Sequence, residues 1–61
     1  MQQYFVNGEA GAYVTIEDKD TIKHMFNVMR LTEDDQVVLV FDDAIKRLAK
    51  VVDSSAHRFQ I

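Results

Sequence analysis

The 61-residue sequence contains no cysteine, no proline and no tryptophan, and only two glycines. Without cysteine, the chain has neither a disulfide framework nor a thiolate metal site. No apolar run approaches the roughly 20 residues of a membrane-spanning helix, and no basic region followed by an apolar stretch opens the chain. A domain this short buries only about 60% of the surface that its unfolded chain exposes, so one small core must hold it. We expect a single cytoplasmic domain with no membrane partner.

Positive charge is also in short supply. Seven Lys and Arg residues face ten Asp and Glu residues, for a net charge of −3. A strong, non-specific nucleic-acid binder usually carries a basic excess, so this class is disfavoured. The acids gather in the predicted turns, which leaves room for a local basic face. Its candidates are Lys19, Lys23, His24 and Arg30 in one group and Lys46, Arg47 and Lys50 in another, with His57 and Arg58 near the end.

Residues with catalytic or ligand-binding chemistry do not form a recognisable site. Ser54 and Ser55 lie in a predicted turn, without the separate base and orienting acid of a nucleophilic triad. Asp20 and His24 share a helix face but have no third ligand, so we expect a side-chain contact between them rather than a metal site. The two glycines do not make a phosphate-binding loop. We predict no catalytic residue, no cofactor-binding residue and no metal ligand in this chain.

Short runs of β-branched and aromatic residues predict four strands, at 4–6, 13–16, 37–41 and 58–61. The run at 37–41 is apolar throughout and too short for a helix, which indicates a buried central strand. In the first strand, at least one of Tyr4 and Phe5 is expected in the core.

One helix is predicted by apolar residues at i, i+3, i+4 and i+7, which place one face of the helix in the core. These residues are Ile22, Met25, Phe26 and Met29. Thr15 and Asp18 resemble a capping box, and acids near the first turn suit the positive helix end. His24 lies off the centre of the apolar stripe and is expected to be partly buried.

The segment 45–52 is ambiguous. Its apolar residues stand at 45, 48, 49 and 52, which is helical spacing behind a possible aspartate cap. Read as a strand, the segment alternates poorly. Local propensity therefore favours a second helix.

Several stretches in order resemble the start of the bacterial ribosomal RNA small subunit methyltransferase E family, the uridine-N3 methyltransferases. The block His24 to Arg30, of the form His-x-x-x-Val-Met-Arg, is the most specific. The supporting stretches are Gln3-Tyr4-Phe5, Glu33-Asp34-Asp35-Gln36-Val37, Val38-Leu39-Val40-Phe41-Asp42 and Arg47-Leu48-Ala49-Lys50-Val51.

Three departures from the family pattern matter. Gln3 replaces an early arginine and so removes one RNA contact. Asp34 replaces the glycine of a turn, and Asp42-Asp43-Ala44 lacks the glycines of a hairpin. The missing glycines bring the geometry of these two turns into question.

The resemblance implies that residues 1–61 form a PUA-like RNA-binding domain, mainly β with one short α-helix, as a small antiparallel β-barrel. It implies a strand at 45–52, paired with 36–41, in place of the helix that propensity favours. The chain stops inside a strand pattern, so we expect a fragment of a longer protein. The resemblance places an absent SPOUT methyltransferase domain after it, which binds S-adenosylmethionine and makes the parent a homodimer.

By this resemblance the chain is the RNA-binding module of a bacterial 16S rRNA uridine-N3 methyltransferase. It helps position ribosomal RNA for methylation by the downstream domain. Arg30, His24 and Lys23 are the candidate RNA-binding residues. For Arg30, a helix-end cap or a salt bridge to the acids at 33–35 is an equal alternative. The alternative function is a protein–protein or intramolecular docking module with no direct RNA contact, which associates with the parent's own C-terminal catalytic domain or with itself.

Overall fold

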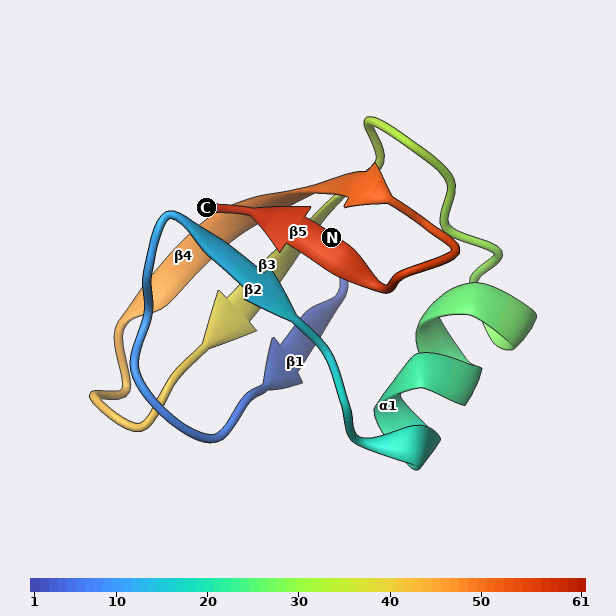
Figure 1. Ribbon diagram of the computed structural model, residues 1–61. Helices are drawn as coiled ribbons and strands as arrows, with labels where there is room; N and C mark the ends of the chain where they lie inside the picture. The colour runs from blue at the N-terminus through green and yellow to red at the C-terminus, as the bar shows by residue number, and fades with distance from the viewer.

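The computed structural model describes residues 1–61 as five strands and one helix (Figure 1). The strands are β1 (Gln3–Phe5), β2 (Tyr13–Thr15), β3 (Gln36–Val40), β4 (Lys46–Asp53) and β5 (Arg58–Gln60). The helix begins as α1 (Lys19–Ile22) and continues without a break as the π-helical segment η1 (Lys23–Val28). The four strands predicted from composition are confirmed, with ends that shift by at most one residue. No helix is long and apolar enough to cross a membrane.

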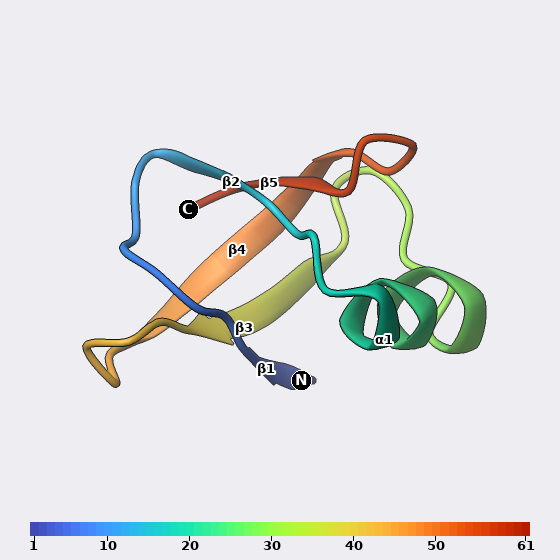
Figure 2. The same ribbon diagram turned by 60° about the horizontal axis from the view of Figure 1, so that its bottom comes forward.

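The strands form one mixed sheet in the order β1-β3-β4-β5-β2. β1 runs parallel to β3, and the other three pairings are antiparallel. Figure 2 shows β2 and β5 in one layer and β1 and β3 in another, with the long β4 running between them. The two edge strands are not paired with each other, so the expected barrel is a curled sheet that hydrogen bonds do not close. Each edge strand has only three residues, so it exposes few unpaired backbone N–H and C=O groups to another strand.

The helix that propensity favours at 45–52 is wrong, and the strand that the resemblance implies is confirmed. β4 pairs with β3 in the register Val37↔Ala49 and with β5 in the register Val51↔Phe59. Because both its edges are paired and its alternate residues Ala49 and Val51 are buried, tertiary contacts outweigh the helical spacing.

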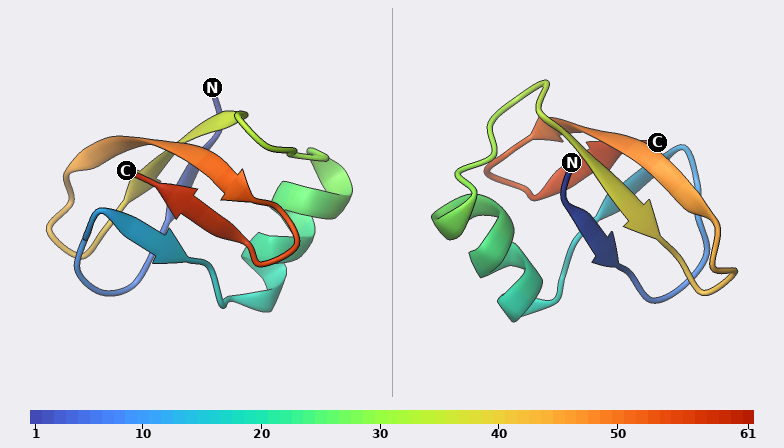
Figure 3. Two further views of the ribbon diagram at one scale, coloured as in Figure 1. Left: turned by 45° about the horizontal axis from the view of Figure 1, so that its top comes forward. Right: turned by 180° about the vertical axis from the view of Figure 1, so that it is seen from behind.

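The core lies on the concave face of the sheet and is closed on one side by the helix (Figure 3). Its members come from every strand except β2, together with the helix and the segments that flank the strands. They are Tyr4, Ile16, Met25, Val37, Leu39, Phe41, Ala49, Val51 and Phe59. Tyr4 is buried while Phe5 is 75% exposed, which confirms the expectation that at least one of the two aromatic residues is in the core.

The helix begins at Asp18, whose carboxylate accepts hydrogen bonds from the backbone N–H and the hydroxyl of Thr21. The predicted capping box is wrong, because Thr15 belongs to β2 and Asp18 is itself the N-cap. The prediction of an acid near the first turn of the helix is confirmed. The Asp18 carboxylate accepts a hydrogen bond from one of the N–H groups that have no partner within the helix.

Met25 is fully buried, but Met29 is 39% exposed, so the expected i+7 member of the core is wrong. The reason is the π-helical segment, in which Met29 donates its N–H to the His24 carbonyl five residues back. This wider turn rotates Met29 away from the sheet. Leu31 packs against the core instead, and its N–H donates to the Met25 carbonyl.

The two turns without the family's glycines keep a glycine-like backbone. Asp34 has φ 73° and Ala44 has φ 63°, both in the left-handed region. Ala44 ends the turn between β3 and β4, where its N–H donates to the Phe41 carbonyl at 2.9 Å. A left-handed backbone costs an alanine roughly 1–2 kcal/mol. The replacement of the family's glycines therefore adds backbone strain to these turns but does not change the path of the chain through them.

Candidate nucleic-acid interface

Arg30 lies just past the helix C-cap Met29, with φ 55°. This left-handed residue ends the helix, and its exposed guanidinium forms no hydrogen bond or ion pair within the chain. The salt bridge to the acids at 33–35, one of the alternative roles of Arg30, does not form. Arg30 therefore keeps its five N–H donors free.

Each acid of the 33–35 turn faces another group. The Glu33 carboxylate accepts hydrogen bonds from the N–H and hydroxyl of Ser54, both at 2.8 Å, and these bonds lower the pKa of Glu33. Asp35 accepts from the N–H of Thr32 at 2.9 Å. Oδ1 of Asp34 lies 4.0 Å from Nζ of Lys50. Glu33 thus ties this turn to the turn after β4, and none of the three acids pairs with Arg30.

His24 is exposed rather than partly buried, and its ring is fixed from one side. The Tyr4 hydroxyl and His24 Nδ1 are 2.8 Å apart, and the two rings meet edge to face with centroids 5.5 Å apart. In the neutral imidazole, Nδ1 accepts from Tyr4 and Nε2 carries its proton outward. The expected contact between His24 and Asp20 does not form.

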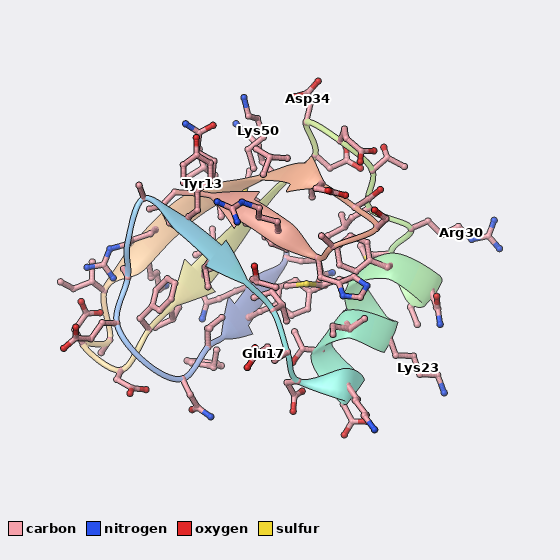
Figure 4. All side chains as sticks on the ribbon, viewed as in Figure 1. Tyr13, Glu17, Lys23, Arg30, Asp34 and Lys50 are labelled. Atoms are coloured by element: carbon pink, nitrogen blue, oxygen red, sulfur yellow. The ribbon has the colours of Figure 1, made fainter.

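Lys19 and Lys23 are both exposed and have no carboxylate within ion-pair distance. Figure 4 shows Lys23 and Arg30 pointing away from the sheet on the helix side of the molecule. Asp20 is the only acid between Lys19 and Val28. We call Lys19, Lys23, His24 and Arg30 the helix surface. Its three cations form no ion pair within the chain, and its imidazole bonds to Tyr4 through Nδ1.

The second basic group of the sequence is divided by the fold. Arg47 donates two hydrogen bonds to the Asp43 carboxylate, at 3.1 and 2.7 Å, and these bonds lower the pKa of Asp43. Lys50 stands on the outer face of the sheet, on the same side as Tyr13 (Figure 4). The sequence alone did not predict which face of the sheet carries Lys50 or Tyr13, because this depends on the register of the strands.

Two of the three hollows of the surface are lined by acids, and the third, of about 280 Å³, is lined by Lys50 with Gln36 and Gln60. A groove of about 380 Å³ lies between β1 and β2, and Glu17 and Asp18 line it. Another, of about 480 Å³, is lined by Glu9, Asp42 and Asp43, with Arg47 already paired. Phosphate groups are disfavoured at both places. No three His, Asp or Glu side chains gather in a way that could hold a metal ion.

The family model of the RNA methyltransferase PUA domain matches residues 16–61. The chain belongs to this family. A solved structure titled "Crystal structure of an hypothetical protein" superposes with a TM-score of 0.79 and 22% sequence identity. The superposition covers 95% of this chain and 25% of the other, so this chain spans about a quarter of that protein's length. This likeness shows the fold alone. No curated protein sequence matches the chain.

Membership in the RNA methyltransferase PUA domain family confirms the resemblance at this level. The matched residues include the whole helix surface and strands β3 to β5. They leave out β1 and β2, and therefore Tyr4 and Tyr13.

Proposed function

We propose that this PUA domain binds small-subunit ribosomal RNA within a bacterial uridine-N3 methyltransferase of the small subunit methyltransferase E family. It positions the RNA for methyl transfer by a catalytic SPOUT domain elsewhere in the parent protein, which acts as a homodimer. The single observation that carries the proposal is the helix surface, whose cations have no partner within the domain. The domain itself makes and breaks no bonds.

Arg30 is the centre of the proposed contact. Its left-handed backbone ends the helix and projects the side chain outward, and no acid competes for it. A planar guanidinium can donate two parallel hydrogen bonds to a phosphate, which a lysine cannot. Lys23 adds a second phosphate contact, and the outward Nε2–H of His24 supplies a donor to a phosphate or base.

S-adenosylmethionine, the methyl donor of the proposed reaction, does not fit this domain. A Cβ added at Gly8 would meet no atom within 4 Å, and one at Gly11 would meet only the Tyr13 carbonyl at 3.7 Å. Neither glycine therefore makes room for a nucleotide-like group. We assign the methyl donor to the proposed catalytic domain and derive no step through it here.

A second candidate function is docking, in which this domain binds the parent's own catalytic domain and does not touch RNA. The observation in its favour is an apolar area on the outer face of β1, β3 and β4. Phe5 is 75% exposed and pairs across from Val40, while Leu48 is 51% exposed and pairs across from Val38. Exposed apolar groups that lie together in this way often mark protein contacts.

The decisive variant is Arg30→Gly. It removes the guanidinium and relieves the left-handed backbone, so the fold should become more stable while RNA affinity falls. We expect about a tenfold loss of affinity for transcribed 16S rRNA in filter binding, with tRNA as competitor. The slope of log affinity against log salt should fall by about one.

Arg47→Ala is the matched control, because it changes the net charge equally but removes an arginine already paired with Asp43. It should leave RNA affinity close to that of the unchanged domain. Equal losses in both variants would reduce the effect to net charge and count against a helix-surface site. A domain that binds no RNA, but binds the separately produced catalytic domain, would establish docking instead.

A further inference from the structure

A continuous row of polar side chains crosses the outer face of the sheet. Tyr13 of β2 is opposite Gln60 of β5, Gln60 is opposite Lys50 of β4, and Lys50 is opposite Gln36 of β3. Their neighbours along the strands, such as Ala49 and Phe59, point into the core, so the four side chains share the outer face. At the usual strand spacing the row is about 14 Å long.

An aromatic platform stands at one end of this row. Tyr13 is 49% exposed and its hydroxyl makes no hydrogen bond within the chain. The Arg58 guanidinium lies 4.7 Å from the centroid of the Tyr13 ring. Arg58 is itself opposite Thr15, so it reaches along the sheet to cover the ring. An exposed tyrosine that stacks with a guanidinium presents two flat surfaces suited to a nucleic-acid base.

The rest of the row complements the platform. Gln60 and Gln36 are exposed amides, each able to donate and accept hydrogen bonds at a base edge. Lys50 is the cation between them, and its contact with Asp34, at 4.0 Å, is weak because the Asp34 side chain is 86% exposed. Figure 4 shows Tyr13 and Lys50 rising from the same side of the sheet, away from Lys23 on the helix.

We propose that this row, Tyr13, Gln60, Lys50 and Gln36 together with Arg58, is a second RNA-binding surface that takes unpaired nucleotides. A base stacks on Tyr13 and Arg58, the amides contact base edges, and Lys50 contacts a phosphate. The length suits the two or three bases that sheet-type RNA-binding domains stack. This inference rests on the proposed RNA-binding function and extends it from phosphates at the helix to single-stranded bases at the sheet.

The test compares two probes, a short single-stranded RNA that carries one 2-aminopurine and a blunt RNA duplex of the same sequence. Binding of the single strand should change the 2-aminopurine fluorescence through stacking. Tyr13→Leu should weaken single-strand binding about tenfold and abolish the fluorescence change, with duplex binding unchanged. Tyr13→Phe keeps the ring and should bind as the unchanged domain does. Arg58→Lys keeps the charge, loses the planar stack and should give an intermediate loss.

Phe5→Leu is the matched control, because Phe5 is also an exposed aromatic residue on an edge strand. It should leave the binding of both RNA probes unchanged. Circular dichroism at the assay temperature checks that each variant is folded. Equal losses in Tyr13→Leu and Phe5→Leu would overturn the surface. If Tyr13→Leu binds normally while Arg30→Gly is weakened, the sheet surface is wrong but the proposed function stands. If the unchanged domain binds neither probe nor 16S rRNA, both proposals fail.

Discussion

The Tyr4 hydroxyl of β1 and Nδ1 of His24 in the helix are 2.8 Å apart, a contact between residues twenty positions apart in the sequence. Tyr4 fills the core with its ring and reaches the surface with its hydroxyl. Burial raises the pKa of Tyr4, so the hydroxyl stays protonated and available to donate throughout the physiological range. When the Tyr4 hydroxyl donates to Nδ1, the proton of a neutral His24 ring is on Nε2, the atom that the proposed RNA contact uses.

Tyr4→Phe should lower the free energy of unfolding by about 1 kcal/mol, because it removes one hydrogen bond while keeping the buried ring. Urea unfolding measures the change. Tyr13→Phe is the control, since the Tyr13 hydroxyl has no partner, and it should change stability by less than about 0.5 kcal/mol. Equal effects of the two substitutions would mean that the bond between Tyr4 and His24 adds nothing to stability.

Met25→Ala and Met29→Ala should differ sharply, although both residues belong to the same apolar pattern. Met25 is fully buried, so its truncation leaves a cavity and should cost about 2–5 kcal/mol. The π-helical segment turns Met29 outward, so Met29→Ala should lower the free energy of unfolding by less than about 1 kcal/mol. Thermal melts followed by circular dichroism compare them. Similar losses would indicate a regular α-helix with Met29 in the core.

Ala44→Gly should stabilise the domain by about 1 kcal/mol, because glycine adopts the left-handed backbone at φ 63° without steric cost. Ala56→Gly provides the control, as Ala56 lies in a turn without a positive φ and should lose about 0.5–1 kcal/mol. Urea midpoints give both values. A destabilised Ala44→Gly variant would show that the unfolded-state entropy of glycine outweighs the strain.

Acid should destabilise the domain through carboxylates that accept hydrogen bonds. The hydrogen bonds from Thr21 lower the pKa of Asp18 below its ordinary value of 3.8, with the hydroxyl the larger cause. A lowered folded-state pKa gives stabilisation that is complete above the unfolded value and is lost as pH falls through the folded value. Glu33, Asp43 and Asp53 are lowered in the same direction. The urea midpoint should therefore stay level down to about pH 5 and fall between about pH 4 and about pH 2.

Asp18→Asn isolates the contribution of the helix cap, because asparagine caps a helix nearly as well but does not titrate. At neutral pH this variant should be close to the unchanged domain in stability. Its loss of stability on acidification should be smaller, because one of the four carboxyl groups with a lowered pKa is absent. An identical acid profile would assign the pH dependence to Glu33, Asp43 and Asp53 alone.

The sequence was a good guide wherever neighbouring residues decide the outcome. Aromatic and β-branched runs located the four strands other than β4, and an acid at the first turn marked where the helix begins. The family block from His24 to Arg30 pointed to an RNA methyltransferase PUA domain, which the match over residues 16–61 confirms. Arg30, His24 and Lys23 remain predictions as RNA contacts.

The tertiary structure decided what depends on distant pairing. Segment 45–52 has helical spacing, yet it became β4 because β3 and β5 offered it two edges at once. Met29 left the core because the helix widened. The alternative salt bridge of Arg30 did not form, and the nearby acids contact Ser54, Lys50 and Thr32. The row from Tyr13 to Gln36 exists only through strand register, which links residues far apart in the chain. Local propensity and motif are written in consecutive residues, whereas register and pairing are set by contacts that form only when the whole chain folds.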